Sequence, residues 1–136
     1  DDKVAFLSAH PIFREIDRDA LTQLCQYAKT RKFRKGAVVF SKGDPGDRLL
    51  LVMSGTVKIG VSAASGRSTI FNLVAAGALF GEIAFLDGSA RTADAVANTA
   101  CEILTFDKRD FLPFMQSQPV LLMKFIELLC QRLRWV

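Results

Sequence analysis

Short apolar runs separated by turn-forming residues fill the middle of the chain, from residue 33 to residue 106. The runs recur roughly every 8–12 residues, which is typical of an all-β sandwich or barrel. Glycine, proline, aspartate and serine cluster between them, as in the turns that connect neighbouring strands. The pattern predicts a mainly β fold of the jelly-roll kind, a double-stranded β-helix. The expected strands are 38–40, 49–53, 56–61, 69–74, 93–97 and 102–106, with turns at 43–47 and 64–67.

Helical patterns flank this β segment on both sides. In residues 1–30, Asp17 is a candidate N-cap, and Asp19 places an acidic side chain in the first helical turn. A shorter apolar segment precedes this helix and is expected to pack beside it. Two apolar sets are therefore predicted in the N-terminal segment: Leu21, Leu24, Cys25 and Ala28 on one helix face, and Leu7, Ile12, Phe13 and Ile16 before it.

The C-terminal segment, residues 107–136, predicts two further helices. Asp107 is expected to cap a short helix that Pro113 interrupts early, and Pro119 fits the first turn of a longer one. The longer helix carries a wider apolar stripe than docking on one surface needs, which favours pairing with the same helix of a second chain. The alternative is a helix wholly buried in its own domain. The predicted dimer interface is Leu122, Phe125, Ile126, Leu129 and Leu133.

Length and composition limit the classes of protein that fit. A chain of 136 residues predicts a single domain, with residues 1–30, 31–106 and 107–136 as its three parts. The three scattered cysteines and the single histidine, His10, argue against a disulfide framework, a zinc site and a cupin-like metal enzyme. We therefore expect no metal, no cofactor and no enzymatic activity. Without an apparent signal peptide or membrane span, we expect a cytoplasmic protein.

A basic run lies at the start of the β segment, where five of the seven residues from Lys29 to Lys35 are Lys or Arg. Such a run can bind nucleic acid. It can also be a solvated strand edge, since charged side chains keep edge strands from pairing with other molecules. We favour the strand edge, because Phe33 is the only aromatic residue within the run.

The segment from residue 79 to residue 93 is the one that carries chemistry. Gly81 leaves room for a ligand to approach the backbone, and the residues from Glu82 onward can form one helical turn whose free N–H groups attract an anion. Arg91 follows a turn at Asp87 and Gly88, so it can face the same pocket and pair with a phosphate. A carboxylate and a guanidinium together suit a sugar phosphate. The plainer alternative is a surface ion pair, but the many apolar neighbours predict that this segment is partly buried.

The same segment resembles the phosphate-binding cassette of cyclic nucleotide-binding domains. The similarity lies in Phe80-Gly81-Glu82-Ile83-Ala84 and Ala90-Arg91-Thr92-Ala93, and it extends to residues 33–40, 43–47 and 49–55. Among these domains, the chain is most similar to the sensors of bacterial catabolite-activator-type regulators. The resemblance implies a homodimer joined by the last helix. It also implies a DNA-binding domain that follows the sensor in those regulators, and we expect that domain to be absent from this chain.

The resemblance also implies a role for each site residue. Glu82 would accept the ribose 2′-hydroxyl, and Arg91 would pair with the cyclic phosphate. Thr92 would contact the phosphate or the base. The backbone of Gly81, Ile83 and Ala84 would approach the ribose and phosphate, with Ala93 completing the motif, and the base would lie near Val74 and Ile59.

Two residues depart from the common family pattern. Ala90 replaces a proline that is frequent before the arginine, and Thr92 stands where serine or alanine is common. We favour cAMP as the ligand and keep cGMP open, since threonine favours guanine in some members. Two other readings remain: the cytoplasmic sensor of a channel, kinase or transporter, and a β-roll oligomerisation module that binds no nucleotide.

Overall fold

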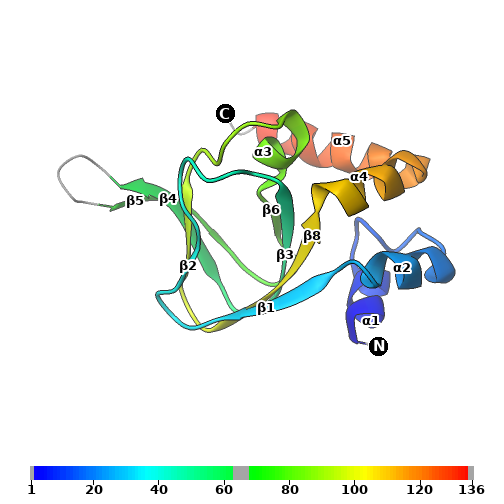
Figure 1. The fold of residues 1–136 in the computed structure, drawn as a ribbon, viewed down its shortest axis with the longest axis horizontal. Helices are drawn as coiled ribbons and strands as arrows, with labels where there is room; N and C mark the ends of the chain where they lie inside the picture. Colours follow the sequence, from blue (N-terminus) through cyan, green and yellow to red (C-terminus); the bar gives the residue numbers. More distant parts are fainter. Residues whose placement is uncertain (1, 63–67, 135–136) are drawn as a thin grey trace. The chain divides into compact units, whose positions relative to one another are not determined.

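The computed structural model describes residues 2–62 and 68–134, and side chains throughout except at 62 and 68–71. The chain forms two compact units, residues 29–108 and residues 1–28 with 109–136. The first unit contains the strands, and the second contains most of the helices (Figure 1). The predicted turn at 64–67 lies outside the described residues.

Two four-stranded antiparallel sheets make up the unit of residues 29–108 (Figure 1). The fold is the jelly roll that the strand spacing predicts, with neighbours that are far apart in sequence, such as the first and last strands. One sheet has the order β1(Lys29–Phe33), β8(Cys101–Asp107), β3(Arg48–Ser54), β6(Leu79–Phe80), and the other the order β2(Val38–Phe40), β7(Asp94–Ala97), β4(Val57–Ser62), β5(Ser68–Val74).

Side chains from both sheets form one core. Strand β3 is apolar along its whole middle, and its residues 49–52 are buried, as expected for a central strand with both faces covered. Within the sheets, β3 pairs with β8 in one and β4 pairs with β5 in the other. The buried members of the core are Val39, Leu50, Val52, Val57, Phe80, Ala95, Ala97, Cys101 and Ile103.

The basic run forms strand β1 and lies at the edge of its sheet, as predicted. It pairs on one side with β8, from Lys29 opposite Thr105 to Phe33 opposite Cys101. Its residues 29–32 are exposed. The N-terminal helical segment is shorter than predicted, because α2 ends at Cys25 and the strand has begun by residue 29.

The helical unit contains α1(Asp2–Ala9), α2(Arg18–Cys25), most of α4(Lys108–Gln116) and α5(Pro119–Leu133). Asp17 stands at the N-cap of α2, as predicted, although its side chain makes no capping hydrogen bond. Aromatic rings connect the elements of this unit. Phe111 contacts Phe13 with ring centroids 6.3 Å apart and Phe125 with ring centroids 5.8 Å apart.

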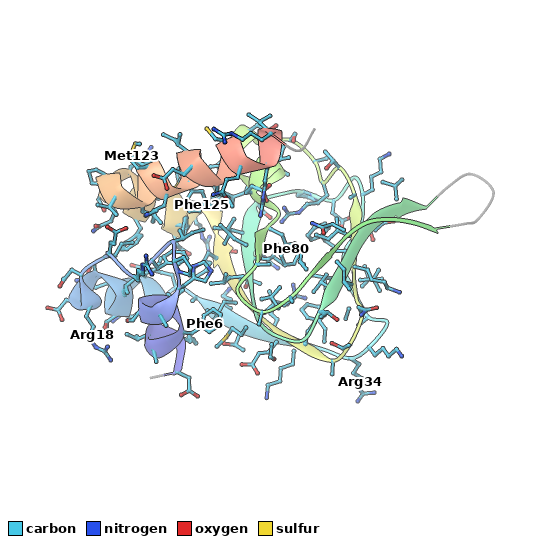
Figure 2. All side chains as sticks on the ribbon, turned by 180° about the vertical axis from the view of Figure 1, so that it is seen from behind. Phe6, Arg18, Arg34, Phe80, Met123 and Phe125 are labelled. Atoms are coloured by element: carbon cyan, nitrogen blue, oxygen red, sulfur yellow. The ribbon has the colours of Figure 1, made fainter. Side chains whose placement is uncertain are left out.

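Two expectations for the C-terminal helices need correction. Pro113 lies inside α4, which continues to Gln116; proline has no N–H to donate to the helix, but it does not end this one. Phe125 is 3% exposed and packs inside its own unit, so its side chain is not available to a second chain. Phe125 and Met123 project from different sides of α5 (Figure 2).

Candidate functional site

The cassette between residues 79 and 93 forms a strand, a short helix and a return loop. Strand β6 leads through Gly81 into α3(Glu82–Asp87), the helical turn that the sequence predicts. Gly81 and Gly88 flank the helix with φ angles of +78° and +76°, a left-handed conformation that glycine adopts without strain. The first amides of a helix have no partner within it, and the family resemblance assigns them to the phosphate.

Arg91 extends into the protein and is held there by backbone carbonyls. Its side chain is 5% exposed. One terminal nitrogen, Nη1, donates a hydrogen bond to the carbonyl of Gly81 at 2.7 Å, and Nη2 donates one to the carbonyl of Arg48 at 2.6 Å. The guanidinium carbon lies 4.4 Å from the centre of the Phe40 ring. The charged group is thus fixed on three sides before any ligand is bound.

The Nε–H of Arg91 is left without an acceptor. Among the buried side-chain nitrogen and oxygen atoms of residues 2–62 and 68–134, this Nε is the one that makes no hydrogen bond. A buried donor without a partner costs about 1–3 kcal/mol, so native proteins rarely keep one without a use. The Nε–H is a donor of the kind that an anionic oxygen can accept from.

Glu82 is the second buried charged group of the cassette, with 5% of its surface exposed. Burial lowers the pKa of Arg91 below its usual value, and the carboxylates of Asp47, Glu82 and Asp44 oppose that effect. Glu82 therefore lies close enough to Arg91 to stabilise its charge. Glu82 and Arg91, which are nine positions apart in the sequence, thus both lie in one buried region.

Gly81 fits closely against Arg91. A Cβ atom at position 81 would lie 2.5 Å from Nη1 of Arg91 and 3.0 Å from Leu50. The glycine is therefore required twice, once for its backbone conformation and once for the space that the arginine occupies.

The turn at residues 43–47 supports the cassette, a role that sequence reasoning missed. The amide of Gly43 donates to the carbonyl of Arg91, and the amide of Arg91 donates to the carbonyl of Asp44, at 2.9 and 2.8 Å. A Cβ on Gly46 would overlap the Cβ of Ala84 in α3. A hollow of about 310 Å³ opens between this turn and the end of α3. The glycines of the turn were the available signal, since such close approach needs a residue without a side chain.

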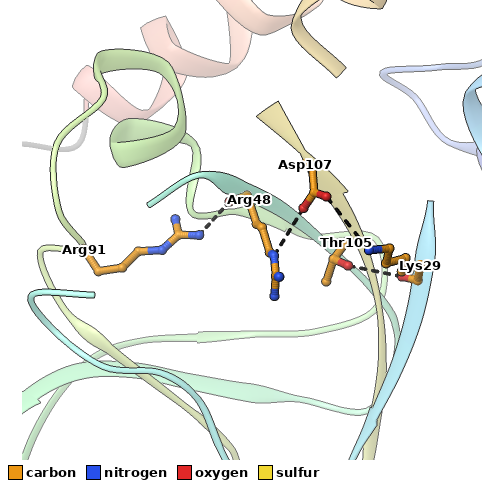
Figure 3. Close-up of polar contacts among 5 residues, drawn as sticks. All are labelled: Lys29, Arg48, Arg91, Thr105 and Asp107. Carbon is orange, nitrogen blue, oxygen red and sulfur yellow. Dashed lines mark hydrogen bonds and ion pairs between the residues drawn. The ribbon is translucent and has the colours of Figure 1, made fainter. Parts of the chain in front are cut away.

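An ion-pair network lies beside the Arg91 anchor (Figure 3). The backbone carbonyl of Arg48 accepts from Arg91, while the Arg48 side chain donates from Nε to Asp107 at 3.2 Å. Lys29 lies 4.0 Å from the same carboxylate. The two cationic side chains are exposed and Asp107 is half-buried, so each pair contributes about 1 kcal/mol or less.

The other residues predicted to contact the ligand differ in their exposure and lie on several elements. Ala84 is buried in α3, whereas the side chains of Ile83, at 54% exposure, and Thr92 are exposed. Ile59 and Val74 are half-buried on neighbouring strands and pack against the core cluster, and Ala93 is half-buried as well. The structure thus brings Gly81, Glu82, Ala84 and Arg91 together. The ligand-binding roles of all these residues remain predictions.

Within residues 2–62 and 68–134, no three His, Cys, Asp or Glu side chains are grouped so that they could hold a metal ion. None of the helices in the described part of the chain is long and apolar enough to cross a membrane.

Comparison with known proteins identifies the family. Residues 30–118 match the family described as the cyclic nucleotide-binding domain, and the chain belongs to that family. It is 30% identical over 123 residues to the CRP-like cAMP-activated global transcriptional regulator of Mycobacterium tuberculosis. The aligned region covers 90% of this chain and 55% of that protein.

Solved structures show the same similarity. The crystal structure of the catabolite activator protein of Thermus thermophilus has a TM-score of 0.81 at 31% identity, over 91% of this chain and 58% of that one. The sensor domain of the transcriptional regulator DNR from Pseudomonas aeruginosa has a TM-score of 0.85 at 25% identity, over 96% of this chain and 88% of that one. The chain therefore spans little more than half the length of the full regulators that it matches.

Proposed function

We propose that this chain is the sensory domain of a transcriptional regulator and that it binds cAMP in preference to cGMP. The observation that carries the proposal is the buried Arg91 with its unpaired Nε–H beside the buried Glu82. Family membership supports a cyclic nucleotide as the ligand. The name of the M. tuberculosis relative supports cAMP and a role in transcription.

The chemistry of the two charged groups fits the two ends of a ribose cyclic phosphate. The guanidinium of Arg91 neutralises the single negative charge of the phosphate and donates to its oxygens. The carboxylate of Glu82 accepts a hydrogen bond from the 2′-hydroxyl, which distinguishes ribose from deoxyribose. The first amides of α3 supply neutral donors next to the phosphate.

The last helix is the proposed link between the ligand and the rest of the regulator. Besides the face that contains Phe125, α5 carries a second apolar face with Met123, Ile126 and Leu133 exposed at 54%, 51% and 71%. We infer that two chains dimerise through this second face, which also includes the half-buried Leu122 and Leu129. A ligand that binds one arrangement of the paired helices more tightly than the other would increase the fraction of molecules in that arrangement.

Parallel calorimetric titrations with cAMP and cGMP test the ligand assignment. The proposal predicts saturable binding of both, with cAMP binding more tightly. Glu82→Ala should lose ~1.5–3 kcal/mol of binding, since one hydrogen bond to a charged group is removed. That variant should also stop distinguishing cAMP from 2′-deoxy-cAMP, whereas Glu102→Ala, which changes a half-buried glutamate on β8, should behave as wild type. Absence of binding to either nucleotide, or tighter binding of cGMP, contradicts the proposal.

A further inference from the structure

We propose that Phe40 is a positioning residue for Arg91, whose guanidinium it holds in the orientation that presents Nε–H to an anionic oxygen. The guanidinium carbon of Arg91 lies 4.4 Å from the centre of the Phe40 ring. A cation at this distance is attracted by the negative face of the ring, and more strongly where water is excluded. This inference rests on the proposed function, since it assigns Arg91 to the phosphate.

The hydrogen bonds of Arg91 show why a third support matters. The carbonyls of Gly81 and Arg48 hold the two terminal nitrogens, at 2.7 and 2.6 Å. These two contacts fix the far end of the side chain, but they do not by themselves stop the planar group from rotating about the line that joins them. A ring whose centre lies 4.4 Å from the guanidinium carbon restricts that rotation by contact. The Nε–H then keeps a fixed direction.

Phe40 is itself well supported. It is half-buried against the core, and its ring centre lies 6.0 Å from that of Phe80, the residue directly before Gly81. Its strand pairs with β7 through Phe40 opposite Ala95. The ring is therefore fixed by the same elements that carry the cassette.

The chain offers a matched control for a purely structural effect. Phe33 packs against the same core cluster, is also half-buried, and has the guanidinium of Arg31 4.9 Å from its ring centre. The guanidinium over the Phe33 ring is that of Arg31, whereas the guanidinium over the Phe40 ring is that of Arg91, so Phe33→Leu removes an aromatic ring of equal size from the same unit. An effect seen with Phe40→Leu alone comes from the position of Phe40.

Binding of cAMP is measured for wild type, Phe40→Leu and Phe33→Leu. Leucine keeps apolar bulk but has no ring face. Phe40→Leu should weaken binding about fivefold, which corresponds to ~1 kcal/mol at ~1.4 kcal/mol per tenfold change. Phe33→Leu should change binding less than twofold. Should Phe40→Leu fail to fold by circular dichroism, Phe40→Met takes its place, because methionine retains similar volume.

A nuclear magnetic resonance signal tests the positioning without any nucleotide. The Nε–H cross-peak of Arg91, identified by its loss in Arg91→Lys, should be shifted upfield by the ring current of Phe40. It should move toward the ordinary arginine range in Phe40→Leu and stay in place in Phe33→Leu. An unshifted peak in wild type, or equal affinities of wild type and Phe40→Leu, overturns the inference. If wild type binds no nucleotide but the peak behaves as expected, the proposed function fails while the positioning of Arg91 by Phe40 is upheld.

Discussion

At the scale of single residues, the sequence predicts which groups do the chemistry but not how they are held. Glycine, glutamate and arginine at positions 81, 82 and 91 point to a sugar phosphate because of their charges and spacing. The carbonyl anchors of Arg91 come from residues 10 and 43 positions away, and any residue type can supply a carbonyl. No sequence pattern could therefore have identified Arg48. Phe40 was equally invisible, since an aromatic residue in a strand is ordinarily part of a core.

The close fit of Gly81 against Arg91 leads to a prediction with a matched control. Gly77 and Gly81 both have positive φ angles, +91° and +78°, but only a Cβ at position 81 meets other atoms. Alanine should cost about 1–2 kcal/mol of folding stability at either position, because both are left-handed. Gly81→Ala should in addition displace the guanidinium and weaken cAMP binding by at least about tenfold relative to Gly77→Ala.

Thermal unfolding and calorimetric titration of the two glycine variants measure these effects separately. Equal affinities in Gly77→Ala and Gly81→Ala would show that the space beside Nη1 of Arg91 does not matter for ligand binding. The close fit of Gly81 against Arg91 would then give no support to the assignment of Arg91 to the phosphate.

At the scale of elements, periodicity located the helices and strands but did not decide which face of α5 is buried. Phe125 and Ile126 are neighbours in one wide apolar stripe, yet they are 3% and 51% exposed. Tertiary packing selects the face, since Phe125 meets Phe111. Similarly, proline normally ends a helix, but Pro113 lies within α4 because the remaining hydrogen bonds of the helix suffice.

Self-association through the exposed face of α5 is testable by mass measurement in solution. Ile126→Asp places a charge in the middle of the proposed interface and should convert a dimer into a monomer of 15.0 kDa. Val120→Asp is the control, because Val120 is 42% exposed and lies roughly 120° around the helix from Ile126. Size-exclusion chromatography with light scattering distinguishes the two states. A monomeric wild type, or a dimeric Ile126→Asp, contradicts dimerisation through this face.

At the scale of the whole molecule, the spacing of strands and turns was sufficient to predict the jelly roll. The pairing of strands was not predictable to the same degree. Lys29 pairs with Thr105 and Val38 with Val96, and such long-range partners are chosen by packing, not by local pattern. One strand was missed altogether: β6 has two residues, too few for a period to be seen.

The central claim is that Arg91 binds the phosphate of a cyclic nucleotide, and calorimetric titration of Arg91→Ala with cAMP tests it most directly. Leaving a buried phosphate charge unpaired should cost ~3–5 kcal/mol, a loss of more than about a hundredfold in affinity. Arg48→Ala removes a nearby exposed guanidinium while keeping the backbone carbonyl, and should bind like wild type. An affinity of Arg91→Ala within threefold of wild type, in a variant that remains folded, would contradict the account.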